Sequence, residues 1–215
     1  MSGKVSARLN TNGLLFYIDG ANSNSYTGTN LVDIAGSRIG TFSSSISLDN
    51  SVYVNIPFNG TDNFITYTLY DNNIISNLTI DCWVNTTSTG TASQIFPIIF
   101  WNSYDTNNLS TNFTLSWENN SFGFYYNDSN TTYRVLSTSA SIIGSWVNPS
   151  VTYDGTNATF YLNGTLLSTS TASISSDPTT DYYFQGNISN VKVYNRTLSS
   201  DEILQNYNFN NHRFN

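Results

Sequence analysis

Residues 78–85 read Leu78-Thr79-Ile80-Asp81-Cys82-Trp83-Val84-Asn85. Alternate positions from Leu78 to Val84 are apolar, and the positions between them carry polar residues and Trp83. Neighbouring side chains of a β-strand point to opposite faces, so this period of two predicts a half-buried strand. Cys82, the single cysteine, lies on the apolar face and is expected to be a core thiol.

The same alternation recurs along the chain and predicts further strands in residues 14–19, 52–56, 113–117, 122–126, 146–147, 151–153, 158–162, 165–167 and 190–193. Asp154-Gly155 and Asn163-Gly164 are hairpin signals, because Gly tolerates the positive φ of a tight turn. No helical pattern separates the strands, so the chain is expected to be all-β. Ser199 with Glu202 three residues later forms a capping-box pattern, which predicts one short C-terminal helix.

Composition supports one domain of this class. Asn, Ser and Thr supply roughly two fifths of the 215 residues, and these residues suit turns and the solvent faces of strands better than helix interiors. A β-sandwich often runs to this length as a single domain. We expect a flexible arm in residues 1–12, a sandwich domain in 13–208 and a tail in 209–215.

Charge excludes several classes of partner. The net charge is −7, with only seven Lys and Arg, so the positive surface that nucleic acids and anionic membranes require is missing. No apolar run is long enough to span a bilayer, which excludes membrane insertion. Met1–Arg8 lacks the apolar core of a signal peptide, so synthesis in a cytoplasm is expected.

Four segments, in order, resemble the laminin-G-like branch of the concanavalin A-like lectin and glucanase superfamily. They are Phe58-Asn59-Gly60-Thr61-Asp62-Asn63-Phe64-Ile65, the strand 78–84, the stretch from Gly144 through Asp154-Gly155 to Asn163-Gly164, and residues 184–203. The resemblance implies an antiparallel two-sheet jelly-roll sandwich. Asn148-Pro149 departs from the family pattern and predicts a bulge or an edge position there.

The beginning of the chain carries a second resemblance. Residues 13–26, with Asp33 and Gly36 downstream, are similar to laminin-G-like domains of tailed-phage and environmental viral structural proteins. This implies a module on the virion surface, such as a head decoration, capsid fibre or tail-fibre domain. Its partners would be other virion proteins and further copies of itself in a homo-oligomer.

The sequence lacks the Glu-x-Asp-x-Glu cluster of carboxylates that the glucanases of this superfamily use for catalysis. A glycosidase needs two carboxyl groups within roughly 5–10 Å of each other, and the chain has only two glutamates, Glu118 and Glu202. The capping box accounts for Glu202, and the only histidine, His212, lies in the tail. The sequence therefore favours a non-enzymatic protein, with a glycoside hydrolase as the least favoured alternative.

Carbohydrate binding is the activity that the resemblance and the aromatic residues favour. Sugars stack on exposed aromatic rings, and the candidates are Trp83, Trp101, Tyr104, Tyr125, Tyr182 and Tyr183. The competing interpretation is that these rings belong to the core. The ligand would be a host-surface glycan, and the alternative to a virion module is a free-standing lectin-like domain.

Calcium is the cofactor that the resemblance implies for a domain of this kind. Asp19, Asp33, Asn59 and Asp62 are the candidate ligands, because carboxylate and amide oxygens suit Ca²⁺. Asn59 stands where the family has Asp, which weakens that position. The competing interpretation is that each of these residues caps a turn.

Overall fold

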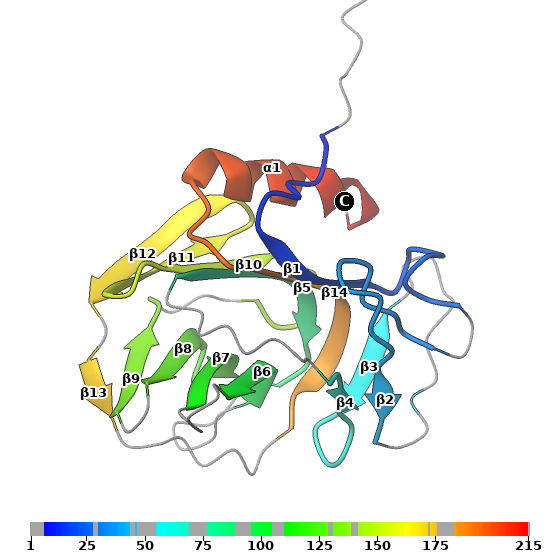
Figure 1. The fold of residues 1–215 in the computed structure, drawn as a ribbon, viewed down its shortest axis with the longest axis horizontal. Coiled ribbons are helices and arrows are strands. Elements are labelled where there is room, and N and C mark those ends of the chain that lie inside the picture. The colour runs from blue at the N-terminus through cyan, green and yellow to red at the C-terminus, as the bar shows by residue number, and fades with distance from the viewer. Residues whose placement is uncertain are drawn as a thin grey trace, which may run out of the picture.

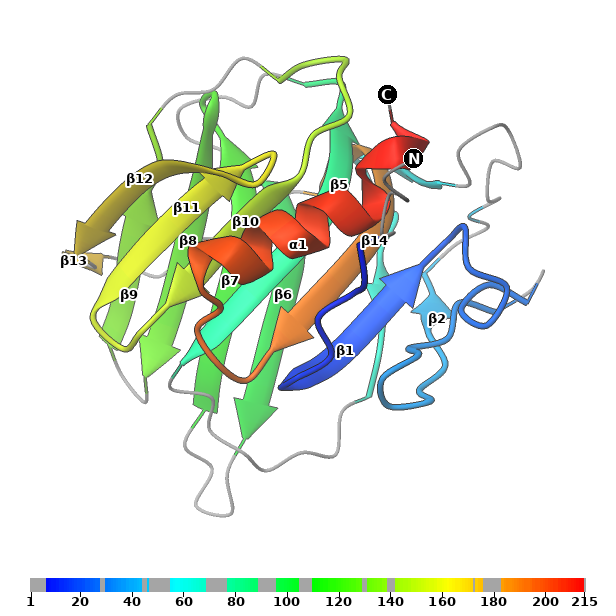
Figure 2. The same cartoon turned by 90° about the horizontal axis from the view of Figure 1, so that it is seen from above.

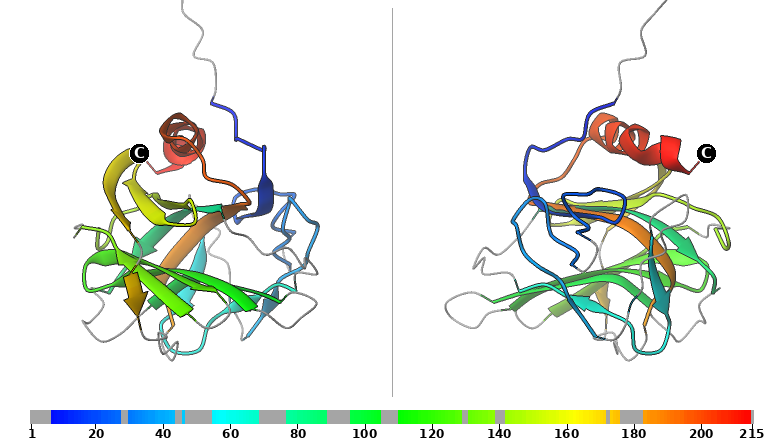
Figure 3. Two further views of the ribbon diagram at one scale, coloured as in Figure 1. Left: turned by 60° about the vertical axis from the view of Figure 1, so that its left-hand side comes forward. Right: turned by 90° about the vertical axis from the view of Figure 1, so that its right-hand side faces the viewer.

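The computed structural model describes residues 7–27, 30–43, 46, 55–68, 77–88, 96–104, 110–128, 131–138, 142–171, 173–175 and 183–214. Over these residues the chain forms two facing β-sheets, with a helix on the outer face of the larger sheet (Figures 1 and 3). The expected all-β sandwich with one C-terminal helix is confirmed. The strand expected in residues 52–56 lies partly outside the described residues.

The larger sheet has seven strands among the described residues. In spatial order they are β1 (Leu14–Asp19), β14 (Gln185–Tyr194), β5 (Leu78–Thr86), β10 (Pro149–Tyr153), β11 (Asn157–Leu162) and β12 (Thr165–Thr171), with β3 (Ile56–Asn59) pairing with the first part of β14. Every pairing is antiparallel. Strand β14 therefore contacts β1, β5 and β3, which brings both ends of the chain into one sheet.

The smaller sheet has five strands within the described ranges, also antiparallel. Their order is β13 (Ser173–Ser175), β9 (Thr131–Leu136), β8 (Ser121–Asp128), β7 (Ser110–Glu118) and β6 (Phe96–Tyr104). The short strands β2 (Thr41–Phe42) and β4 (Ile65–Thr66) pair with each other beside β3 (Figure 1).

Two hairpins have the turn geometry that their residues favour. Asn163 and Gly164 join β11 to β12 with φ of 52° and 75°, as a type I′ turn requires. Asn119 and Asn120 join β7 to β8 with φ of 44° and 59°. The hairpin expected at Asn163-Gly164 is confirmed.

Pro149 lies inside the sheet, so the expected bulge or edge position is wrong. It is the first residue of β10, between β5 and β11, and the register runs without a shift from the Val147–Val84 bridge to the Ser150–Asp81 pair. Pro has no N–H to donate to β5. The Asn148 side chain supplies the donor instead, because its Nδ2 lies 2.7 Å from the Cys82 carbonyl oxygen.

The core between the sheets contains the apolar face predicted for residues 78–85. Leu78, Ile80, Cys82 and Val84 are fully buried there. Cys82 is a core thiol as expected, and burial raises its pKa. Phe113, Leu115 and Trp117 of β7 form part of the opposite wall.

Helix α1 (Ser200–Asn210) covers the outer face of the larger sheet (Figure 2). Its N-terminus has the predicted capping box between Ser199 and Glu202. The helix has 11 residues, and the residues beyond 208, which were expected to form a tail, continue it into the 3₁₀ turn η1 (Asn211–Arg213). Ile203 packs with Tyr161, Tyr194 and Leu198 of the layer below.

A row of polar side chains lies buried under this layer. The Lys192 Nζ is 2.7 Å from Asp81 Oδ1 and 3.0 Å from Asn190 Oδ1, and Lys192 and Asp81 are both fully buried. Ser150 donates to Asp81 Oδ2 at 2.8 Å. An ion pair removed from water needs such additional hydrogen bonds, because each charge loses its solvation.

The described part of the N-terminal segment packs against the same layer. Tyr194 donates its hydroxyl to the Asn10 carbonyl, and the Asn10 side chain donates to Glu202. Arg196 Nε lies 2.9 Å from the Asn12 carbonyl. The expected arm is thus in contact with the sandwich over residues 8–12. No helix in the described part of the chain has the length and apolarity needed to cross a membrane.

A double-mutant cycle tests the buried ion pair. We expect Lys192→Met and Asp81→Asn each to lower the free energy of unfolding by about 3–5 kcal/mol, because each leaves a charged or polar partner buried without its mate. The double variant should lose clearly less than the sum of the two losses. Urea unfolding followed by circular dichroism measures all three, and strictly additive losses would contradict the pairing.

The Glu202 carboxylate makes stability depend on acid pH. The hydrogen bond from Arg196 comes first among the causes that lower its pKa from 4.5 to about 2. A depressed folded-state pKa stabilises the fold above pH 4.5, and this contribution is lost as pH falls towards 2. Glu202→Gln should lower stability by about 1 kcal/mol at pH 7 after allowance for solvent screening.

Thermal unfolding between pH 7 and pH 2.5 checks this expectation. The difference between wild type and Glu202→Gln should narrow steadily below pH 4.5. Asp201→Asn is the matched control, since Asp201 is an exposed acid in the same helical turn. A difference that stays constant with pH would mean that the ion pair does not stabilise the native state.

Candidate functional site

Trp83 is buried beneath the C-terminal segment, so the expectation of an exposed ring is wrong. Its ring stacks with Phe214 at a centroid distance of 4.1 Å and with Tyr207 at 5.6 Å, and 2% of its surface is exposed. Arg213, the neighbour of Phe214, is anchored by Asp19. The polar face of β5 therefore faces a second layer instead of solvent.

Trp101 and Tyr125 are also buried, and their rings are closed to a sugar. Trp101 points into the core and stacks on Phe113 at 5.4 Å. Tyr125 donates its hydroxyl to Glu118 at 2.8 Å, and burial followed by the Glu118 charge raises the tyrosine pKa. Tyr104 is the last residue of β6, with no side-chain placement to describe, and Tyr182 lies outside the described residues.

Tyr183 is the sequence-predicted aromatic residue that forms an open platform. It is half-buried just before β14, and its ring stacks with Phe64 at 6.0 Å with 17° between the planes. Phe64 has 46% of its surface exposed, which is unusual for so large an apolar side chain. Sequence reasoning missed Phe64, although it lies in the 58–65 motif, because its partner is 119 positions away in the chain.

The turn between β3 and β4 is held rigidly beside this pair. Asn59 Oδ1 accepts the backbone N–H of Thr61 and Asp62 at 2.9 and 3.1 Å, and Asn59 Nδ2 donates to Asp62 Oδ1 at 2.7 Å. Gly60 N–H donates to the Phe184 carbonyl at 3.1 Å, which joins the turn to the segment that carries Tyr183. Asp62 is exposed and Asn63 is half-buried, so polar groups border the aromatic pair.

The four candidate calcium ligands do not fit a calcium site. Asp33 is paired with Arg38 at 2.6 Å, and Asp19 is held by Arg213 through both carboxylate oxygens at 2.8 Å. Asn59 points its amide N–H group at the Asp62 carboxylate. A Ca²⁺ ion bound between these two residues would need an oxygen atom from each of them. Within the described residues, no three His, Cys, Asp or Glu side chains gather to hold a metal ion.

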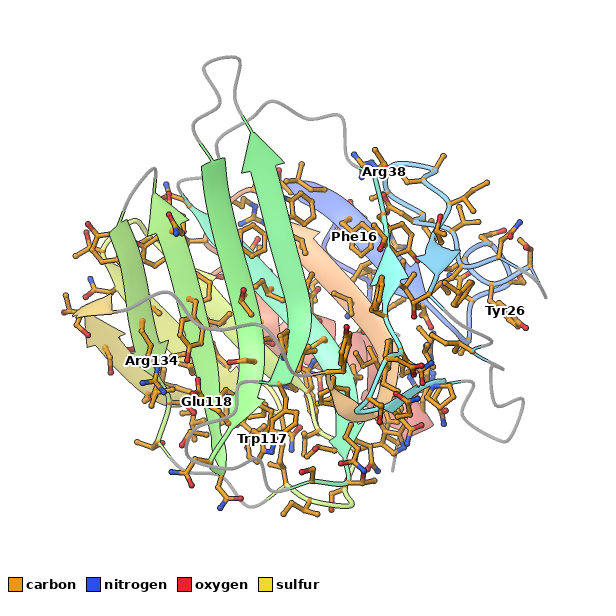
Figure 4. All side chains as sticks on the ribbon, turned by 90° about the horizontal axis from the view of Figure 1, so that it is seen from below. Phe16, Tyr26, Arg38, Trp117, Glu118 and Arg134 are labelled. Atoms are coloured by element: carbon orange, nitrogen blue, oxygen red, sulfur yellow. The ribbon has the colours of Figure 1, made fainter. Side chains whose placement is uncertain are left out.

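Both glutamates are engaged in structural contacts. Glu118 accepts from Tyr125 and Arg134, the latter at 2.6 Å, and Figure 4 shows Glu118 and Arg134 together on the smaller sheet. Glu202 belongs to the cap of α1 and to the ion pair with Arg196. Glu118 lies on the smaller sheet, whereas Glu202 lies in the helix that covers the outer face of the larger sheet.

A cavity of about 530 Å³ lies behind the Phe64–Tyr183 pair, within the size range of small-molecule sites. The described residues that line it are Phe16, Ile18, Ile56, Phe58, Asn63, Phe64, Ile65, Thr66, Tyr67, Pro97, Ile98, Ile99, Trp101, Tyr183, Phe184, Ile188 and Val191. None of these is acidic or basic. The arrangement offers a neutral, largely apolar hollow with an aromatic platform and polar groups at its rim.

Solved structures with a similar fold include receptor-binding domains of neurotoxins. The binding domain of botulinum neurotoxin DC in complex with SialylT has a TM-score of 0.66 at 14% identity, and the receptor-binding domain of botulinum neurotoxin type G has 0.64 at 17%. The binding domain of botulinum neurotoxin DC with rat synaptotagmin II has 0.66 at 14%. Each match covers 91% of this chain and 51% of the other, so the chain spans about half of these neighbours. At such identities the likeness shows the fold alone.

Sequence comparison gives the family. No curated protein sequence matches significantly. A laminin-G family model, described as the concanavalin A-like lectin/glucanases superfamily, matches residues 59–204, which is well over half of the 215 residues. The matched range begins in the turn beside Phe64, includes Tyr183 and every strand from β4 to β14, and ends within α1. The chain therefore belongs to the concanavalin A-like lectin/glucanase superfamily.

Proposed function

We propose that this protein is a non-enzymatic carbohydrate-binding module that holds a glycan on the Phe64–Tyr183 pair. The observation that carries the proposal is the open, stacked aromatic pair beside an ordered polar turn. The apolar face of a sugar ring would lie on these rings. Asp62 and Asn63 lie where they could bond the hydroxyl groups at the edge of the sugar.

Preorganisation of the turn favours binding. The four hydrogen bonds made by the Asn59 side chain fix residues 59–63 before a ligand arrives, so little conformational entropy is lost on association. This gives Asn59 a positioning role in place of the metal-binding role first considered.

The electrostatics favour an uncharged glycan. The described lining of the cavity has no Lys, Arg or His, and the exposed charge of the turn is the Asp62 carboxylate. Arg38, which lies near Phe16 in Figure 4, is paired with Asp33. An acidic sugar would face like charge without a compensating cation. Selectivity should therefore differ from that of the neighbour solved with a sialylated ligand.

The fold relationship supports a binding role, since the neighbours are named as a binding domain and a receptor-binding domain. The surface of a virion stays the proposed location, with other virion proteins and further copies of the chain as partners. Its support is the resemblance of residues 13–36 to viral structural domains. A free-standing lectin-like domain is the alternative, and both use the same glycan site.

Substitution of the aromatic pair tests the proposal. A glycan array identifies a neutral ligand, and calorimetry with that ligand should show about tenfold weaker binding for Phe64→Ala and Tyr183→Ala, or ~1.4 kcal/mol each. Leu166→Ala is the matched control, because Leu166 is 59% exposed on β12 at the other edge of the sheet. Adding sialic acid to the ligand should weaken binding, and EDTA should leave it unchanged.

Three results would contradict the proposal. An array that stays blank with and without calcium removes the glycan function. Equal affinity of wild type and both aromatic variants moves the site elsewhere. Preference for the sialylated form overturns the electrostatic argument.

A further inference from the structure

The cavity behind the aromatic pair exists because the two sheets end unevenly. Strand β6 is the last strand of the smaller sheet in the described chain, whereas the larger sheet continues through β14 to β1 and β3. Figure 1 shows β3 and β4 beside this end of the sandwich, and Figure 4 shows Phe16 beyond the edge of β6. Part of the inner face of β1 and β14 thus faces a hollow instead of a strand.

The walls of the hollow have the chemistry of a protein core. Ile56, Trp101 and Ile188 are almost fully buried, and most of the lining residues are isoleucines or aromatic residues. Tyr67 brings a hydroxyl, but it donates to the Leu31 carbonyl at 3.1 Å. Burial, followed by the charge of Asp33, raises the Tyr67 pKa, so this hydroxyl stays neutral. A charged or strongly polar group would lose its hydration here without finding partners.

The hollow is continuous with the proposed sugar site. Phe64 and Tyr183 form the platform and also line the cavity, and Asn63 and Thr66 lie at the same rim. A group attached to a sugar on the platform would therefore begin at the opening. An alkyl chain suits the hollow, because its apolar surface matches the isoleucine and aromatic side chains that line it.

We propose that the cavity accepts an uncharged alkyl chain carried by the bound glycan, so that the protein recognises alkyl glycosides and sugars of glycolipid type. The inference rests on the proposed carbohydrate function and adds the ligand class. Each methylene that leaves water should raise the affinity about fourfold. A longer chain should therefore gain affinity until the cavity is full.

The probes are methyl and octyl β-D-glucopyranoside, with 1-octanol as the chain without a sugar. Binding to the 215-residue chain is measured by calorimetry and by tryptophan emission, since Trp101 lines the cavity. The octyl glycoside, kept below its micelle concentration, should bind at least tenfold more tightly than the methyl glycoside. Trp101→Phe should remove most of the emission change, which assigns the signal to the wall of the cavity.

A variant in which a larger side chain fills the cavity gives the decisive test. Ile99 is half-buried on the edge strand β6 and lines the hollow, so Ile99→Trp adds bulk at a position that is open on one side. This variant should bind both glycosides equally, at the wild-type affinity for the methyl form. Retained methyl glycoside binding also shows that it has folded.

The outcomes separate the inference from the proposed function. Equal affinity of wild type for both glycosides overturns the alkyl site and leaves the sugar site standing. Binding of octanol and octyl glycoside with the same affinity, insensitive to Phe64→Ala but lost in Ile99→Trp, supports the chain site and overturns the sugar site. Failure of all three probes to bind overturns the inference.

Discussion

Strand β14 buries both of its faces, and the architecture depends on how this is achieved. Its inner face gives Ile188, Val191 and Val193 to the core between the sheets, while Lys192 and Tyr194 point the other way. A fully buried lysine is tolerated only with a counter-charge and further hydrogen bonds, and Asp81, Ser150 and Asn190 supply these. The helix α1 and the C-terminal turn are the cover that makes this burial possible. Helix α1 also anchors the N-terminal segment, since Asn10 donates hydrogen bonds to Asn206 and Glu202.

Local patterns in the sequence were sufficient to predict most elements of the fold. The strand in residues 78–85, the Asn163-Gly164 turn and the Ser199–Glu202 capping box each depend on neighbours within a few positions, and each is confirmed, although the strand is buried on both faces and not on one. The predictions that proved wrong concern residues whose surroundings depend on contacts beyond the pattern of their own strand. Trp83 lies on the polar face of its strand, and only the packing of Phe214, 131 positions later, shows that this face is covered. Pro149 fits an inner strand because Asn148 replaces its missing donor, which no propensity encodes.

The candidate site could be predicted only in part for the same reason. Tyr183 was selected as an aromatic residue near a turn, but Phe64 became its partner through the pairing of β3 with β14. The residues first considered as calcium ligands proved to organise the structure: Asp19 and Asp33 hold arginines, and Asn59 shapes the turn. The cavity has no sequence signature, since it arises from the different extent of the two sheets. What the sequence did indicate is the scarcity of basic residues, with seven Lys and Arg among 215 residues, which agrees with the neutral lining.

Amide chemical-shift mapping with a neutral glycan tests the central claim most directly. A ¹H–¹⁵N spectrum is recorded as the glycan is added to ¹⁵N-labelled protein. The account predicts that the largest shifts fall in residues 59–66 and 183–186, on two segments that are distant in sequence and joined at the aromatic pair. Shifts concentrated instead on the outer face of the smaller sheet, around Glu118 and Arg134, would contradict it and place the glycan on the other side of the sandwich.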